Sequence, residues 1–526
     1  MCYYLNMSST KGIFKALENL ISDSQTSKPL KILIVAVESA PYASVGGFSS
    51  VIAYLSKELK RLGHDVRIFM PKFGFIDEQK YGLKLVKEGL KVPTDFPENP
   101  YLICNVKTSF SNNVQTYFLE NQEYYELRAN VYGYSDDPTR WALLSRGVLE
   151  FIRSGEFVPD IIHCNDWHTG IVSNYLKTMY KEDKILSEIP TIFTIHNLAI
   201  QGNFDHWHVA ELDMDDGRSA VASFFDERLN KQNFMRRGIL YSDAVNTVSK
   251  TYSKEILSPE FGQGLDKLLL ELRSKLYGIV NGLDYEEFNP ETDKLIEKNY
   301  DINSLELRLE NKISLQKEFG LKESLETPIF GFVGRLDWQK GVDMLVKVLE
   351  NVMKNFDVQF VEVGGGDGGI ADMLRNLQRQ FPDKVGVHTH LNFALSRSLF
   401  SGCDIILYPS RFEPCGIVQL EAMRYGALPL VRKVGGLADT VEDVNSVDGT
   451  GTGFVFNDFD EFSLYGQIVR AIELYRNKVL WRKLQRNVMK KDFSWGYSAK
   501  EYERLYLRAN SLKNTESLNI TIDRPI

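Results

Sequence analysis

Short apolar runs alternate with amphipathic helical patterns along most of this chain. Residues 31–37 form the first run, which is typical of a strand buried on both faces of a sheet. Gly46 and Gly47 follow it, and apolar residues then recur with a helical period from Phe48 to Leu62. Residues 66–70 form the next run. A strand, a glycine loop, a helix and a strand in this order require a parallel crossover.

The same alternation recurs in two series. Further strands are expected at the apolar runs 161–162, 192–195, 244–248, 330–333, 358–363, 385–387, 405–408 and 428–431. Two such series predict an α/β protein with two Rossmann-like, doubly wound domains, joined near the polar stretch 289–310. Ligands of such sheets bind beyond the carboxyl ends of the strands, so two domains of this kind can face each other across a cleft.

Length and charge narrow the classes of function. The 526 residues suffice for two or more domains, and 43% hydrophobic with 25% charged residues is an ordinary globular composition. The net charge of −8 gives no bulk support for a nucleic-acid partner or an anionic membrane surface. No apolar run reaches the ~20 residues that cross a bilayer. The sequence leaves the oligomeric state open.

The cysteines favour a reduced, cytoplasmic protein, because there are five of them and no CxxC pair. The first 30 residues lack the basic-then-apolar order of a secretory signal. Within this extension, Ile13, Leu17, Leu20 and Ile21 could form a short amphipathic helix, and partial disorder is the alternative.

Residues 409–416, which read PSRFEPCG, carry the strongest chemical signal. Glu413 lies in a loop bounded by Pro and Gly, and Glu421 follows on an expected helix. Their Cα atoms can be at most roughly 12 Å apart if the segment is helical throughout. That is about the span from the sugar to the ribose of a nucleotide sugar, and a helix N-terminus beside them suits a diphosphate. The alternative for both carboxylates is a solvated helix face, and the neighbours Phe412 and Cys415 argue against it.

Basic residues and glycines follow other expected strands. Arg335 and Lys340 come after the run 330–333, where a planar guanidinium and a compact ammonium suit a diphosphate leaving group. As isolated residues they would be ordinary surface charges. Gly46 and Gly47 could let the backbone approach a phosphate or a sugar, or could simply form a tight turn. They do not belong to a GxGxxG dinucleotide fingerprint.

Histidines and an aspartate follow two more strands. His163, Asp166 and His168 come after one expected strand, and His196 comes after another. These side chains could bind sugar hydroxyls, with Trp167 as a stacking face. A metal site is conceivable because His and Asp are common ligands, but no HExxH occurs. A capping or core role is the third alternative, and no metal is expected.

In this order, the motifs resemble the bacterial glycogen synthase and plant starch synthase family. The resemblance covers residues 31–509 and is carried by HNLAIQG at 196–202, GLD at 264–266, VNGLD at 280–284, QKG at 339–341, SRFEPCG at 410–416, RYG at 424–426 and GGL at 435–437. It implies a GT-B fold and a retaining hexosyltransferase. The expected donor is a nucleotide-glucose, with ADP-glucose favoured over UDP-glucose, and the acceptor is the non-reducing end of an α-1,4-glucan. The family needs no cofactor and no catalytic metal.

The resemblance also divides the chain and assigns roles to its residues. It implies an N-terminal extension (1–30), an acceptor-side domain (31–280), a nucleotide-sugar domain (281–485), a helix that crosses back to the first domain (486–512) and a tail (513–526). Glu413 would contact the donor glucose near the reacting centre, Arg335 and Lys340 would bind the diphosphate, and His196 and Asp166 would hold the glucose. Further donor-binding residues would be Gly46, Gly47, Tyr125, Asn197, Asn281, Cys415, Gly416, Ile417 and, at the ribose, Glu421.

One loop departs from the family pattern, which reads Lys-x-Gly-Gly-Leu-x-Asp-Val. Here Ser44 and Ser50 stand in place of the Lys and the Asp. Loss of a cation from the leaving-group site is comparable to loss of one oxyanion donor, which costs about 2.7–4 kcal/mol of transition-state stabilisation. Two alternatives therefore accompany an active glucan synthase. One is a catalytically weak glucan-binding or priming homologue, and the other is a retaining glycosyltransferase with another donor or acceptor.

Overall fold

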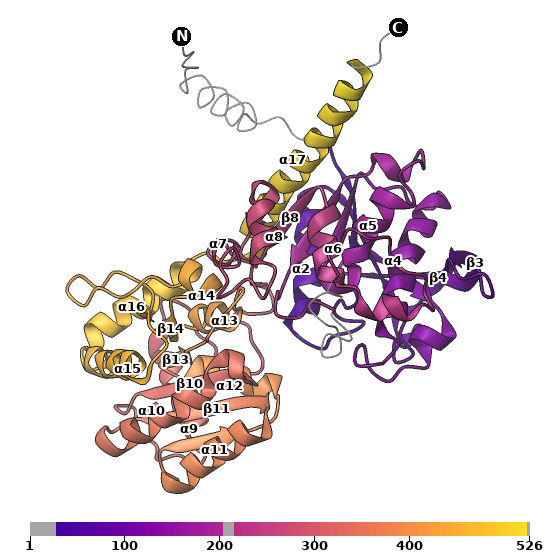
Figure 1. Cartoon of the computed structure of the whole chain (residues 1–526). Coiled ribbons are helices and arrows are strands. Elements are labelled where there is room, and N and C mark those ends of the chain that lie inside the picture. The colour runs from indigo at the N-terminus through magenta and orange to yellow at the C-terminus, as the bar shows by residue number, and fades with distance from the viewer. Residues whose placement is uncertain (1–27, 203–214, 523–526) are drawn as a thin grey trace, which may run out of the picture.

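Two mostly parallel sheets, each flanked by helices, form two domains that meet along one side (Figure 1). The computed structural model describes residues 28–202 and 215–522, with side chains as far as residue 511. The helix expected around residues 13–21 lies outside the described residues. Among the described helices, none is long and apolar enough to cross a membrane. Cys104, Cys164, Cys403 and Cys415 are buried free thiols.

The first sheet has nine strands in the order β3-β4-β5-β2-β1-β6-β7-β8-β9. Its strands are β1 (Lys31–Val35), β2 (Asp65–Pro71), β3 (Lys84–Pro93), β4 (Tyr101–Ser111), β5 (Val114–Glu120), β6 (Ile161–Asn165), β7 (Thr191–Ile195), β8 (Ala244–Thr247) and β9 (Leu276–Gly278). The order reverses between β1 and β6, which makes their carboxyl ends the switch point where doubly wound sheets bind ligands.

The helices of the first domain cover this sheet in two groups. They are α2 (Gly47–Arg61), α3 (Glu78–Tyr81), α4 (Asp137–Arg153), α5 (Gly170–Thr178), α6 (Phe234–Tyr241), α7 (Tyr252–Glu255) and α8 (Asp266–Glu271). Buried residues of α4, α5, α6 and α8 share one core with the sheet. Buried residues of α2 and of the C-terminal helix α17 (Trp495–Ile522) share another.

The second sheet has six parallel strands in the order β12-β11-β10-β13-β14-β15. They are β10 (Ile329–Leu336), β11 (Gln359–Gly366), β12 (Val385–His388), β13 (Ile405–Tyr408), β14 (Leu428–Arg432) and β15 (Phe454–Phe456). The accompanying helices are α9 (Arg308–Glu318), α10 (Val342–Asn355), α11 (Gly368–Gln380), α12 (Phe393–Gly402), α13 (Val418–Arg424), α14 (Gly435–Thr440), α15 (Glu461–Tyr475) and α16 (Lys478–Lys490). Here the order reverses between β10 and β13, so this pair forms the second switch point.

The strands expected from the apolar runs are present, but one part of the first sheet was not predicted. β4 pairs antiparallel with both β3 and β5. Only one face of this edge is covered, since exposure alternates along β4. Tyr101 and Ile103 are about half exposed, whereas Leu102 and Cys104 are buried. Half-exposed antiparallel strands alternate apolar and polar residues, and a search for continuous apolar runs misses them.

The chain crosses between the domains twice, and the two crossings are hydrogen-bonded to each other. The Leu283 amide donates to the Phe493 carbonyl at 2.8 Å, and the Trp495 amide donates back to the Leu283 carbonyl. A Cβ at Gly282 would lie 2.5 Å from the Cα of Trp495, so only glycine permits this approach. α17 then runs back over the first domain, where His163 Nδ1 lies 2.9 Å from the Tyr506 hydroxyl.

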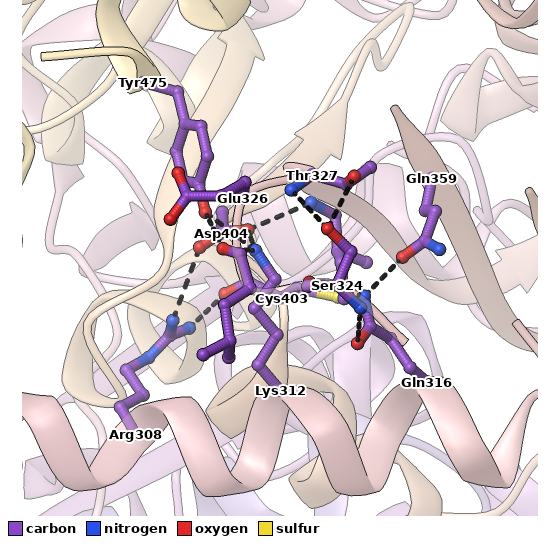
Figure 2. A network of polar contacts seen from close by, with 12 residues as sticks. Arg308, Lys312, Gln316, Ser324, Glu326, Thr327, Gln359, Cys403, Asp404 and Tyr475 are labelled. Carbon is purple, nitrogen blue, oxygen red and sulfur yellow. Dashed lines mark hydrogen bonds and ion pairs between the residues drawn. The ribbon is translucent and has the colours of Figure 1, made fainter. Parts of the chain in front are cut away.

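A buried polar network holds the far end of the second sheet, away from its switch point (Figure 2). Lys312 Nζ on α9 lies 2.8 Å from Asp404 Oδ2 and donates to the Tyr475 hydroxyl. The same Asp404 oxygen accepts from the amide of Ile329, which begins β10. A buried ion pair supports structure when its remaining donors and acceptors are satisfied. This network therefore fixes the amino ends of β10 and β13 and leaves their carboxyl ends to the site.

Glu362 on β11 is a buried carboxyl group outside the site. Its side chain has no exposed surface, and neither carboxyl oxygen has a hydrogen-bond partner among the described residues. Burial raises the pKa of Glu362 to about 8, and the backbone amide of His388 stabilises the charged form only in part.

We predict that Glu362→Gln stabilises the protein more at pH 8 than at pH 5. The folded protein keeps a proton that the unfolded chain releases, so stability falls as pH rises from 4.5 to about 8. The loss amounts to roughly a few kcal/mol. Thermal unfolding of both proteins at the two pH values measures it, with the exposed Glu297→Gln as control. An equal gain at both pH values would contradict the prediction.

Candidate active site

The first half of the site lies at the switch point of the first sheet. Asp166 directly follows β6, and His196 directly follows β7. Asn165, the last residue of β6, places its side-chain oxygen 3.0 Å from His196 Nε2. The ring of Phe48, in the first turn of α2, packs edge-on against His196 at 4.7 Å. Strand ends far apart in the sequence thus gather these side chains at one edge.

Asp166 is a buried acid with spare hydrogen-bonding capacity. Its side chain is 8% exposed, its φ is +59°, and Oδ1 has no hydrogen-bond partner among the described residues. Burial raises the pKa of Asp166 to about 8, although the backbone amides of His196, Trp167 and Asn197 favour the charged form. Burial also lowers the pKa of His196 to about 3, so the imidazole is neutral. Such an acid and a neutral imidazole are suited to sugar hydroxyls.

The other two histidines of this cluster serve the core. His163 is fully buried, and its second ring nitrogen lies 2.6 Å from the Thr194 hydroxyl. His168 stacks on Trp167 with ring centres 3.9 Å apart. Burial lowers the pKa of both imidazoles. Only Asp166 and His196 of the four candidates therefore remain at the sheet edge.

The glycine loop between β1 and α2 is held by Glu38, a residue that the sequence patterns did not single out. Its carboxylate accepts a hydrogen bond from the Val45 amide at 2.6 Å and another from the Tyr132 hydroxyl. The space in front of Gly46 is open, so backbone is available there to a ligand. Glu38 could have been found from the sequence because it is an acidic residue that directly follows the first apolar run.

The serines that replace the family's Lys and Asp lie in and beside this loop. Ser44 is exposed, and its Oγ lies 2.7 Å from Oγ of Ser49. The Ser49 hydroxyl also donates to the carbonyl of Gly46. Ser50 is partly exposed in the first turn of α2. The loop is therefore ordered by hydroxyl contacts, and Ser44 supplies no cation to the cleft.

The second half of the site lies at the switch point of the second sheet. Arg335 lies at the carboxyl end of β10, Lys340 lies in the loop after it, and Glu413 lies in the loop after β13. Lys340 Nζ lies 2.5 Å from Glu413 Oε2, and both side chains are largely buried. The Ser410 hydroxyl donates to the same oxygen at 3.2 Å. Arg335 is more than half exposed and pairs with Asp337, so its guanidinium remains accessible to a ligand.

Gly435 and Gly436 pack directly against the backbone of the loop that contains Glu413. A Cβ at Gly435 would lie 1.8 Å from the carbonyl oxygen of Glu413, and one at Gly436 would lie 1.9 Å from that of Cys415. The Gly436 amide also donates to the Glu413 carbonyl at 3.1 Å. These two glycines are therefore required by contact of backbone against backbone.

Cys415, Gly416 and Ile417 connect this loop to α13. The Cys415 thiol is buried, and burial raises its pKa although the Asn281 backbone amide partly offsets the effect. Asn281 is itself buried with an unpartnered side-chain oxygen among the described residues. Gly416 has a φ of +72°, which favours glycine. α13 begins at Val418 without a side-chain cap at Ile417, so its first amides can serve an anion.

Glu421 lies on α13, recessed but partly accessible to solvent. Its carboxyl has no hydrogen-bond partner within the described part of the chain. The pKa of Glu421 is raised to about 7, mainly by burial. The charge of Arg397 lowers this pKa and the charge of Glu287 raises it, both to smaller extents. An unpartnered carboxyl at this place can accept hydrogen bonds from a diol.

The two halves meet across the cleft. A Cβ at Gly47 would lie 3.7 Å from Cδ1 of Ile417, so the glycine loop of the first domain touches the start of α13 in the second. Burial raises the pKa of Tyr252, and the charges of Asp166, Glu255 and Glu413 raise it further. Tyr252 therefore lies near carboxylates of both domains. Of the predicted site residues, Gly47 and Ile417 are thus in contact between the domains, and Asp166 and Glu413 lie near one tyrosine.

Tyr125, which the resemblance gave as a donor-binding residue, lies in the core of the first domain. It lies in a short π-helical turn (Gln122–Glu126), its side chain is fully buried, and its hydroxyl donates to the Arg140 carbonyl. The turn points the ring into the core beneath Phe73. Asn197, by contrast, is partly exposed, and its side chain accepts from the Ala199 amide.

A cluster of acids on the first domain has ligand atoms close enough for a cation. It consists of Glu78, Glu120 and Glu126, which approach one another within 4.8 Å. Lys72 and Lys107 already pair with these carboxylates. The two ammonium groups neutralise most of the charge, so the cluster is an ion-pair network.

Comparison with known proteins gives one consistent result. The starch synthase catalytic domain family matches residues 31–271, and the glycosyl transferases group 1 family matches residues 315–487. Glycogen synthase of Desulforudis audaxviator is 39% identical over 91% of this chain and 96% of its own length. Glycogen synthase of Fervidobacterium nodosum is 40% identical over 92% and 99%.

Solved structures agree. The catalytic domain of starch synthase IV from Arabidopsis thaliana, bound to ADP and acarbose, superposes with a TM-score of 0.81 at 32% identity, covering 92% of this chain and all of that one. Sucrose-phosphate synthase from Thermosynechococcus elongatus, at 18% identity and a TM-score of 0.56, shares the fold. With two doubly wound α/β domains and these matches along most of its length, the chain belongs to the glycogen synthase and starch synthase family of glucosyltransferases.

Proposed function

We propose that this protein transfers glucose from a nucleotide-glucose to the non-reducing end of an α-1,4-glucan with retention of anomeric configuration. The observation that carries this proposal is the Lys340–Glu413 ion pair at one switch point, with Asp166 beside the His196 backbone amide at the other and Tyr252 near both carboxyl groups. A cation for a leaving group and hydroxyl-binding groups for a sugar lie on opposite walls of one cleft. ADP-glucose is the favoured donor, because the starch synthase IV structure holds ADP.

In this proposal, each wall handles one part of the donor. Arg335, Lys340 and the first amides of α13 bind the diphosphate and stabilise its charge as the glycosidic bond breaks. Glu421 accepts hydrogen bonds from the ribose, and Asp166 and His196 hold the glucose. Lys340 also pairs with Glu413 and holds it in place beside the anomeric carbon.

Retention fits a same-face route. The acceptor hydroxyl attacks from the side that the diphosphate leaves, and a departing phosphate oxygen takes the hydroxyl proton. This route needs neither a nucleophile–base pair nor a metal from the protein. Closure of the two domains excludes water, which would otherwise hydrolyse the donor.

The decisive experiment measures transfer from labelled ADP-glucose and UDP-glucose to glycogen or maltooligosaccharide. We expect incorporation into the glucan that depends on the acceptor, faster with ADP-glucose. Glucan binding without transfer from either donor would contradict the proposal. It would instead favour the catalytically weak homologue that Ser44 and Ser50 suggest.

Lys340→Ala should lower kcat by about 10²–10³-fold, the effect of losing one donor to a developing oxyanion. KM for the donor should change less, because Arg335 still binds the diphosphate. Lys347→Ala, an exposed lysine on the following helix α10, is the matched control. A change confined to KM would contradict the prediction, since it would show that Lys340 binds the ground state and the transition state equally.

Ser44→Lys should raise kcat, by up to about 10²-fold if the serine is a full deficit. The side chain at position 44 is exposed beside the open glycine loop, so a lysine can reach the cleft without displacing packed atoms. Val45→Lys, on the neighbouring exposed position, controls for added charge. An unchanged kcat in Ser44→Lys would mean that another group already fills the role.

A further inference from the structure

Two short helices from different domains hydrogen-bond to each other across the cleft. The Gly435 amide, which begins α14 in the second domain, donates to both carboxylate oxygens of Glu255 on α7 at 3.0 Å. In return, Asp439 on α14 accepts from the amide and the hydroxyl of Thr251, at 3.0 and 2.6 Å. The start of α14 thus receives its N-terminal cap from the first domain, and Thr251, directly before α7, is held by the second.

The two helix starts differ in their local caps: the Ser249 hydroxyl accepts from the first amide of α7, Tyr252, whereas α14 has no side-chain cap from its own domain. Thr251 and Val434 occupy the N-cap positions of α7 and α14, and neither makes a side-chain capping bond within its helix. Unsatisfied amides at a helix start are normally capped by a side chain, by water or by a ligand. The contact between the domains is therefore built into the start of α14, whose first amide has Glu255 as its partner.

The capped end of α14 is also the support of the catalytic loop. Gly435 lies with its Cα against the Glu413 carbonyl, and the Gly436 amide donates to that carbonyl. Glu255 holds the Gly435 amide, so the chain of contact runs from the first domain through Gly435 to the backbone of Glu413. Separation of the domains would remove the first link.

We propose that Glu255 is a positioning residue which, when the domains are closed, fixes the Gly435–Gly436 turn and thereby aligns Glu413 with Lys340. This inference rests on the proposed transfer reaction. It adds that the alignment of Glu413 depends on closure of the two domains. Glu255 is half-buried and faces Arg432 as well as the acids Asp439 and Glu260, and burial raises its pKa. Burial of the Glu255 carboxylate costs solvation free energy, and the hydrogen bonds from the Gly435 amide offset part of that cost.

The test compares Glu255→Ala in two backgrounds. In the native background we expect kcat for glucosyl transfer to fall about 10-fold or more, whereas in Glu413→Ala the same change should cost less than about 3-fold, because coupled residues are not additive. Glu255→Gln, which keeps one acceptor oxygen, should restore part of the loss. Glu260→Gln, an exposed acid five positions on, is the control and should leave kcat unchanged. An equal loss in both backgrounds would overturn the proposal, since it would show a merely structural effect.

A second measurement does not depend on turnover. Small-angle scattering with saturating ADP should give a larger radius of gyration for Glu255→Ala, and for Thr251→Val, than for the native protein. Equal radii would overturn the role of this contact in closure. Failure of transfer in the native protein together with larger radii in the variants would instead contradict the transfer reaction while supporting the contact.

Discussion

The structure depends on how the two crossings between the domains are joined. Leu283 and Phe493 belong to segments more than 200 residues apart, yet they are hydrogen-bonded to each other, with Gly282 against the backbone of Trp495. Because both connections pass through this one point, the two crossings are held together there. α17 then packs on the first domain. The loops after β1 and β13, one strand of each switch point, thus come into contact, as Gly47 and Ile417 show, and the proposed chemistry requires that contact.

Electrostatics distinguish the two walls of this cleft. On the second domain, Lys340 compensates Glu413 directly, and Arg335 remains exposed. On the first domain, Asp166 lies beside a neutral His196 and has no ion-pair partner among the described residues, and Ser44 supplies no cation. The diphosphate must therefore be neutralised almost entirely by one wall. This asymmetry fits a donor that binds first to the second domain and meets the hydroxyl-binding wall upon closure.

Much of this architecture could be predicted from the sequence. Strands buried on both faces appear as continuous apolar runs, and polar residues directly after such runs lie at one sheet edge. For that reason Asp166, His196, Arg335, Lys340 and Glu413 could be chosen before their geometry was known. The antiparallel strands β3 and β4 could not, because one of their faces is exposed and their apolar residues alternate with polar ones.

The sequence by itself determined the two doubly wound domains, the strand ends that carry the site and the family, because these follow from local patterns of residues. Only the tertiary structure decided which side chains face the cleft. It buried Tyr125 and His163, since a π-helical turn and the packing of α17 direct them into cores. It also gave Glu38 and Glu255 their partners, because contacts between segments distant along the chain leave no periodicity in the sequence.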